Sequence, residues 1–255
     1  MTVGIVIKAK DGIVVACYSL STFARGVPVL RYANKIYVIE HPDLENRVVV
    51  IGAGMSTFVD KFISRVKTQA ITLAKADIAK HGDKRKLDIV DFSERVAETV
   101  VCLLFKEYAV DRQQFFGMNI GDYSLSLIIA GATHAGELKS YFVYGNGLSE
   151  AVEDYGTIGS GAAYAELFMR NLMPEPSRVS AEHAAGLSVY VIKGVEIMDP
   201  YVGGKTNVNI LKMVNKTLEI APLKPVLTPM NAKEKMDRVL SRVGENMRNL
   251  IMKKR

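Results

Sequence analysis

The spacing of apolar positions changes several times along the chain, and each change marks the end of a predicted element. Strand-like runs of β-branched and apolar residues cover 2–8, 13–18, 29–39, 47–51, 123–132, 138–144, 208–214 and 217–220, and a short one ends at 156–161. Helical spacing, with apolar residues on one face, covers 56–80, 88–108, 162–173 and 180–198. Lys10-Asp11-Gly12 lies between the first two runs and predicts a tight β-hairpin.

The order of these elements is strands, two helices, strands, two helices, strands. It lacks the regular strand–helix alternation of a parallel α/β fold. It favours instead an α+β fold, a four-layer αββα sandwich in which two antiparallel sheets stack face to face between helix pairs. We assign this domain to residues 1–221 and find no internal repeat in it.

The C-terminal end of the chain follows a different pattern. Three prolines within 222–230 indicate an extended connector. Residues 231–255 predict a basic amphipathic helix, because apolar residues recur there at alternating spacings of four and three. We expect this helix to dock on its own domain or on a neighbouring subunit, with a membrane surface as the alternative.

Net charge first suggests a nucleic-acid partner, but the position of the charge does not. The chain has 33 Lys and Arg against 27 Asp and Glu, a formal net charge of +6. Residues 231–255 hold eight basic and three acidic residues and so account for +5 of it. The rest of the chain shows no basic patch interleaved with aromatic residues, so we expect no nucleic-acid partner.

The sequence has neither a run of roughly 18–20 apolar residues nor a secretory signal. We therefore predict a cytoplasmic protein with no membrane partner.

Several kinds of chemistry lack their motifs in this sequence. Gly52-Ala53-Gly54 lacks the third glycine of a dinucleotide fingerprint. The four histidines show no metal-ligand spacing, and we predict neither a cofactor nor a metal. Cys17 and Cys102 lie in apolar stretches, which favours buried free thiols over a disulfide.

A threonine beside the initiator methionine remains as a candidate nucleophile. A threonine hydroxyl needs an adjacent base, and at a chain terminus the residue's own α-amino group can serve, because its pKa is about 7.7–8.0. Removal of Met1 would make Thr2 such a residue. Threonine at position 2 is common, so this feature alone carries little weight.

The segments around Thr2 resemble those of proteasome β subunits, and five of them occur in that family's order. The matching segments are Thr2 with Lys10-Asp11-Gly12, 34–39, 52–55, 154–161 and 199–204. The resemblance implies a divergent, proteasome-like N-terminal-nucleophile hydrolase of archaeal type, with the αββα fold that the element order indicates. It also implies a peptide or unfolded-protein substrate and a homo-oligomer or β-type ring.

The resemblance also assigns roles to individual residues. Thr2 would attack the carbonyl carbon while its own amine shuttles the proton, and Lys35 would stabilise the alkoxide by its charge. The N–H of Gly54 would donate to the oxyanion, and Met55 would line an apolar substrate pocket. The hydrogen bonds around the amine would be completed by Ser160 and Asp199.

Two positions depart from the family pattern. Tyr18 stands where the family has an acid that pairs with the lysine. Lys35 then needs another partner, such as Asp199, or stays desolvated with a lowered pKa. Val202 replaces a serine and cannot hydrogen-bond the amine.

Three functions fit such a site. The first, which the sequence predicts, is a threonine peptidase that acts through an acyl-enzyme on Thr2. The second is a connectase-like transpeptidase or peptide ligase; connectases resemble proteasome β subunits but pass the acyl group to another amine. The third is a non-catalytic structural subunit, which the residues at Tyr18 and Val202 favour.

Overall fold

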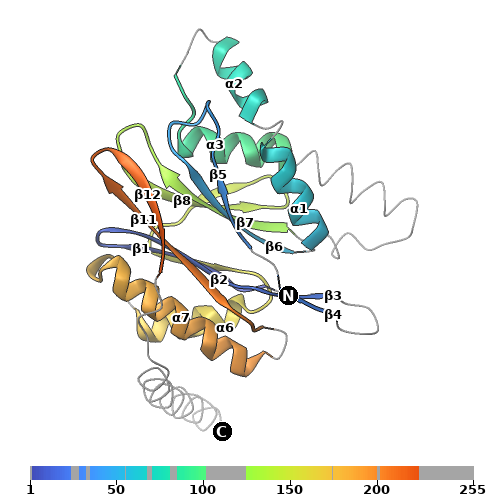
Figure 1. Ribbon diagram of the computed structural model, residues 1–255, viewed down its shortest axis with the longest axis vertical. Helices are drawn as coiled ribbons and strands as arrows, with labels where there is room; N and C mark the ends of the chain where they lie inside the picture. The colour runs from blue at the N-terminus through green and yellow to red at the C-terminus, as the bar shows by residue number, and fades with distance from the viewer. Residues whose placement is uncertain are drawn as a thin grey trace, which may run out of the picture.

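Two five-stranded antiparallel sheets lie face to face, with helices on both outer sides (Figure 1). The computed structural model describes residues 2–23, 29–32, 35–54, 56–67, 71–80, 85–101, 125–173, 175–199 and 202–223. This arrangement confirms the predicted α+β sandwich of four layers. The predicted C-terminal helix, most of the proline-containing connector, and Cys102 lie outside the described residues.

The first sheet combines strands from both ends of the chain, in the order β10-β1-β2-β11-β12. Its strands are β1 (Gly4–Ala9), β2 (Gly12–Tyr18), β10 (Tyr155–Ile158), β11 (Thr206–Val214) and β12 (Thr217–Pro222). The β1–β2 hairpin turns at Lys10 and Asp11, as the sequence predicts. Every residue of β2 is buried, because this strand has a neighbour on each side and apolar layers on both faces.

The second sheet has the order β5-β6-β7-β8-β9, and a separate hairpin pairs β3 with β4. The strands are β3 (Leu20–Phe23), β4 (Val29–Tyr32), β5 (Ile36–Ile39), β6 (Val48–Gly54), β7 (Leu125–Ala132), β8 (Leu138–Tyr144) and β9 (Ser149–Ala151). The prediction of one strand over 29–39 is therefore wrong, because β4 pairs with β3 whereas β5 pairs with β6. A run of β-branched residues indicates extended backbone, but it does not show where a strand ends and the next segment pairs with a different strand.

Helices cover the outer face of each sheet. They are α1 (Ser56–Arg65), α2 (Ile71–Lys80), α3 (Ile89–Arg95) with the π-helical turn η2 (Val96–Val101), α6 (Ala162–Leu172), the short 3₁₀ turn η5 (Pro176–Arg178) and α7 (Ala181–Met198). The single helix predicted over 56–80 is found as two, α1 and α2. The predicted helix from 88 begins as expected, while its predicted end lies outside the described residues.

Three apolar layers hold the four structural layers together. One lies between the first sheet and the helices α6 and α7, one between the two sheets, and one between the second sheet and α1 to α3. Successive residues of β2 alternate between the first two layers: Ala16 and Tyr18 face the helices, whereas Cys17 faces the other sheet. Both faces of this strand are thus apolar, which explains its continuous apolar sequence.

The start of α7 is tied to the tip of the first hairpin. Ser180 is its N-cap, and its Oγ accepts a hydrogen bond from the N–H of His183 at 3.3 Å. Asp11 accepts from the N–H of Ala181 at 2.7 Å and pairs with Lys212 of β11 at 2.7 Å. The Lys212 ammonium lowers the pKa of the Asp11 carboxyl, so this carboxylate joins three elements while ionised.

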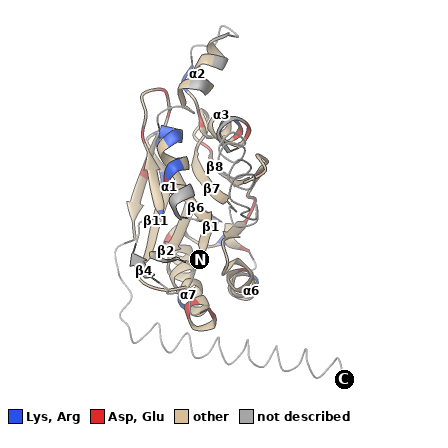
Figure 2. Cartoon of the chain, turned by 90° about the vertical axis from the view of Figure 1, so that its right-hand side faces the viewer, with Lys and Arg blue, Asp and Glu red and all other residues tan. Residues whose placement is uncertain are grey.

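Charged side chains are distributed unevenly among the helices. In the view of Figure 2, Lys and Arg are seen on α1, and Asp and Glu on α3 and α7. None of the described helices combines the length and the apolar character that a membrane span requires.

Candidate active site

Thr2 lies just before β1, against the turn that follows β10. Its backbone N–H donates to Ser160 Oγ at 3.2 Å, and its carbonyl oxygen accepts from the N–H of Gly161 at 3.3 Å. Gly159 has φ +94°, and a Cβ at this position would lie 2.0 Å from the Thr2 carbonyl oxygen. The turn therefore fits closely around Thr2, which is 5% exposed.

Lys35 lies just before β5 and extends to the end of β2. Its Nζ is 4.1 Å from the centroid of the Tyr18 ring, and the residue is 7% exposed. Burial lowers the pKa of the Lys35 ammonium to about 8, the desolvated state that the sequence analysis gives as one alternative. The ring face attracts the ammonium, which offsets part of the lost hydration.

Tyr18 lies near both a cation and an anion. Burial raises the pKa of its hydroxyl far above the ordinary value, and the negative charge of Asp199 raises it further. Asp199 is the C-cap of α7 and is 8% exposed. The neutral Tyr18 ring thus takes the place of the expected acid, contacting Lys35 through its face.

The neighbouring thiol does not share this chemistry. Burial raises the pKa of Cys17 to about 12, and the charge of Lys35 only partly opposes this. Cys17 therefore stays a neutral thiol, as its apolar surroundings predict. Cys17 is paired with Gly4, so the end of β2 that carries Cys17 and Tyr18 lies beside the start of β1.

The remaining predicted residues have different surroundings. Gly54 is the exposed last residue of β6, with φ +134°, a backbone conformation that favours glycine. Met55 lies outside the described residues. Val202 is 2% exposed, and its N–H donates to the carbonyl oxygen of Asp199 at 3.0 Å. Its side chain packs near Gly161, where a Cβ would lie 3.3 Å from Val202 Cγ2.

The structure brings the predicted residues together in two groups. Thr2 and Ser160 form one, and Lys35, Tyr18 and Asp199 form the other. The two groups lie at the same end of the paired strands β1 and β2.

The structure has a pocket beside this region that was not predicted from the sequence. Its volume is about 350 Å³, and it lies between β8, β10 and the start of α6. Its aromatic lining comes from Phe142, Tyr144 and Tyr155. From the sequence, these residues look like ordinary strand positions. They come together only because strands of two different sheets lie side by side, which no local pattern indicates.

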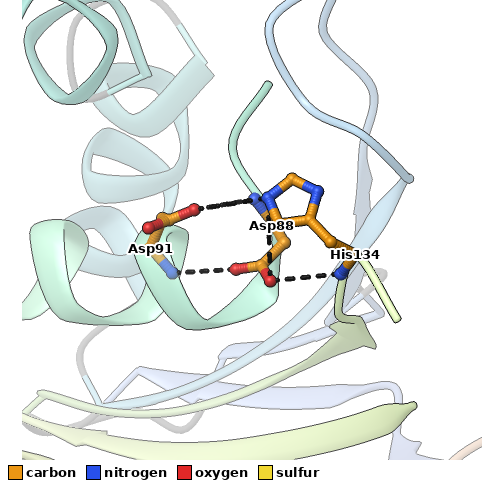
Figure 3. A group of neighbouring side chains, drawn as sticks. All are labelled: Asp88, Asp91 and His134. Carbon is orange, nitrogen blue, oxygen red and sulfur yellow. Dashed lines mark hydrogen bonds and ion pairs between the residues drawn. The ribbon is translucent and has the colours of Figure 1, made fainter. Parts of the chain in front are cut away.

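Asp88, Asp91 and His134 form a second cluster, whose potential ligand atoms all lie within 4.8 Å of one another (Figure 3). The oxygens of Asp88 accept hydrogen bonds from the backbone N–H groups of Val90, Asp91 and His134. The carboxylate of Asp91 forms a two-bond ion pair with Arg85, at 2.5 and 2.8 Å.

A guanidinium thus occupies the position beside these oxygens that a metal would need. The hydrogen bonds form a capping box at the start of α3, since Asp91 also accepts from the N–H of Asp88 at 3.2 Å. These contacts fit a structural cap better than a metal site.

Replacing Tyr18 with leucine is expected to lower the pKa of Lys35 by roughly one pH unit below its value of about 8, because the ammonium loses the attraction of the ring face. Tyr18→Phe retains the ring and should leave the pKa unchanged. An NMR titration of the lysine side chains measures both. A rise toward the ordinary value of 10.5 in the leucine variant would contradict this account of the contact.

No family model matches the chain, and no curated protein matches it either. Two solved structures are similar over almost the whole length. Anbu (ancestral beta-subunit) from Yersinia bercovieri has a TM-score of 0.65 and 14% identity and covers 95% of this chain and 96% of its own. A Gly-1 mutant of Anbu from Hyphomicrobium sp. strain MC1 has a TM-score of 0.68 and 14% identity, with 96% and 97% covered.

These neighbours correct the assignment to the proteasome β-subunit family, which is wrong. They are Anbu proteins, a proteasome-like but distinct family, and no sequence match to proteasome subunits supports the assignment. The matching segments are short, so they indicate a type of fold and do not establish membership of one family. At 14% identity, the likeness shows the fold alone.

Proposed function

We propose that the chain is an amide hydrolase of the N-terminal-nucleophile type, a threonine peptidase that acts through Thr2 once Met1 is removed. The observation that carries the proposal is the hydrogen bond of 3.2 Å between the Thr2 nitrogen and Ser160 Oγ. Once this nitrogen is an α-amine, Ser160 would orient it beside the Thr2 hydroxyl. A terminal amine can then act as the base that a threonine nucleophile needs.

The reaction would proceed by acyl transfer. Thr2 Oγ attacks the substrate carbonyl carbon, and its proton passes to the α-amine. The carbon–nitrogen bond of the substrate then breaks, the leaving amine takes that proton, and an ester on Thr2 remains. Water, activated by the same amine, cleaves the ester and regenerates the hydroxyl.

Lys35 and Gly54 would stabilise the charges that arise. With a pKa of about 8, Lys35 is mostly an ammonium at pH 7 and would favour the developing alkoxide on Thr2. Gly54 is exposed at the end of β6, has no side chain, and has a φ of +134°, which side chains rarely adopt. Its N–H is our candidate for the oxyanion donor, a contribution worth about 3–4 kcal/mol in other enzymes.

We also propose that the chain works as a homo-oligomer. The name of one structural neighbour, ancestral beta-subunit, describes a part of an assembly. The fold is shared over 95% of the chain, so a similar mode of association is the simplest hypothesis. Sedimentation of the purified full chain tests it, and a strictly monomeric species would contradict it.

A structural, non-catalytic role is the second candidate. It is favoured by the burial of Thr2 in the full-length chain and by Val202, whose apolar side chain packs where a hydroxyl would assist the amine. This candidate predicts that the purified chain keeps Met1 and does not react with electrophiles.

Labelling with an acylating electrophile such as a β-lactone separates the two candidates. We expect intact-mass measurement to show a chain that begins at Thr2 and gains one acyl group. Thr2→Ala should abolish the adduct, whereas Thr2→Ser should retain it. The matched control is Thr217→Ala, which changes an exposed threonine in β12 and should label like the parent. Labelling of the Thr2→Ala protein, or none of the parent after confirmed Met1 removal, would refute the peptidase.

A further inference from the structure

The pocket lined by Phe142, Tyr144 and Tyr155 lies on the opposite flank of β1 from Lys35. In the first sheet, β1 is placed between β10 and β2. Lys35 contacts Tyr18 at the end of β2, whereas the pocket is lined by residues 155–159, in and just after β10. Thr2 lies just before β1. Lys35 is therefore on one flank of this strand and the pocket on the other.

Gly159 joins the pocket to Thr2. This glycine lines the pocket, and a Cβ on it would lie 2.0 Å from the carbonyl oxygen of Thr2 and 3.0 Å from its Cβ. The pocket wall is therefore in van der Waals contact with the proposed nucleophile residue. The pocket therefore lies one residue's thickness from Thr2, close enough for a substrate bound at Thr2 to reach it.

The pocket offers aromatic faces. The rings of Phe142 and Tyr144, from one face of β8, have centroids 6.1 Å apart and a tilt of 32°. The Phe142 ring lies directly on Gly156, where a Cβ would be 2.0 Å from the ring tip. Tyr155 and Ile158 of β10 add apolar surface, while Ser126, Thr157 and Glu166 add polar surface, so the lining is mixed.

Two hydroxyl groups of the lining are engaged with carboxylates of the protein. The hydroxyl of Tyr155 donates to Glu166, which also pairs with Arg170 at 3.0 Å. The hydroxyl of Tyr144 donates to Glu150 at 3.0 Å. Glu166 is the charged member of the described lining and pairs with Arg170, so the aromatic rings are the surface left to contact an uncharged aromatic guest.

We propose that this pocket binds the side chain of the residue that follows the scissile bond and prefers an aromatic one. The inference rests on the proposed role of Thr2 as the nucleophile. Extended peptide spans about 3.3–3.6 Å per residue, so in a substrate that crosses the start of β1 the two sides of the reacting carbonyl would lie on opposite flanks of this strand. Lys35 and Gly54 would hold the acyl half, which leaves the pocket for the leaving half. Its volume, near the lower end of the roughly 300–1,000 Å³ typical of ligand pockets, suits one side chain.

The test uses two peptide substrates that share the acyl half and carry either phenylalanine or glycine after the scissile bond. For the parent protein, we expect kcat/KM to favour phenylalanine by about tenfold to a hundredfold. Ser126→Leu places a larger side chain in the pocket from β7 and should reduce this ratio to about one. The matched control is Leu148→Ala, a 62%-exposed residue just after β8 that does not line the pocket; it should keep the parent ratio.

A binding measurement keeps this inference separate from the proposed function. Phenylalaninamide should bind the Thr2→Ala protein in ligand-detected NMR, and the added Ser126→Leu change should abolish the signal. Cleavage without phenylalanine preference, or binding that Ser126→Leu does not alter, would overturn the pocket assignment while leaving Thr2 as nucleophile. Binding that Ser126→Leu abolishes, in a chain without Thr2-dependent cleavage, would refute the peptidase but support an aromatic ligand site here.

Discussion

Lys35→Met is expected to reduce peptide cleavage by about 10²- to 10³-fold and, at the same time, to stabilise the folded chain. The loss follows from removing the one positive charge that we assign to the Thr2 alkoxide, an effect comparable to the loss of an oxyanion donor. The gain follows because Lys35 is buried, with 7% of the residue exposed, and so lacks much of the water that favours its charge. Methionine has a similar length and carries no charge.

The size and pH dependence of the stabilisation follow from the pKa. A fall from the ordinary value of 10.5 to about 8 corresponds to roughly 3 kcal/mol of penalty for the charged form in the folded chain. Allowing for the lost ring contact, we expect Lys35→Met to raise the free energy of unfolding by about 1–3 kcal/mol at pH 7.

The advantage of the methionine variant should shrink as pH rises. Between about pH 8 and 10.5, the unfolded parent chain still binds the proton that the folded chain has lost, so the parent becomes more stable with rising pH. Urea unfolding of both proteins at pH 7 and pH 10 measures the difference. Equal stability at pH 7 would contradict the buried charge, and full activity of the variant would remove Lys35 from the mechanism.

Gly159→Ala is expected to destabilise the chain by about 2–4 kcal/mol and to abolish labelling of Thr2. The new methyl group would lie 2.0 Å from the Thr2 carbonyl oxygen, a backbone atom that cannot rotate away, and the φ of +94° adds strain. Relief requires the 159–161 turn to move off Thr2, which breaks the hydrogen bond to Ser160.

Gly186→Ala provides the matched control for this substitution. Gly186 lies within α7, and no atom lies within 4 Å of the position that its Cβ would take. Alanine at this position should stabilise the chain by about 0.5–1 kcal/mol, because alanine is the better helix former. Thermal and urea unfolding measure both variants. If Gly159→Ala unfolds like the parent, the close fit of the turn around Thr2 is incorrect.

The sequence predicted the elements whose signals are local. The Asp11-Gly12 turn, the cap at Ser180 and the strand 138–144 all depend on nearby residues, and the structure has them as predicted. The layered arrangement also followed from the order of the elements. The exposed three-residue strand β9 gave no apolar signal and was not predicted.

Tertiary relations were the part that the sequence could not supply. The run 29–39 looks continuous, although its two halves pair with different strands. The ring of Tyr18 serves as the partner of Lys35 only because strands of different sheets meet there. The short segments around Thr2 indicated the fold but led to the wrong family, since similar turns serve related folds at 14% identity.

The arrangement around Thr2 cannot form until the ribosome has made most of the chain. Its hydrogen-bond partner Ser160 is 158 positions further along the chain. Strand β2 pairs on one edge with β1, and its other edge pairs with β11, which ends at Val214. Pairings between such distant segments are slow to form. A nascent chain that has exposed only its first residues therefore has the threonine but none of the surroundings that orient it, so assembly of the site must follow the synthesis of both sheets.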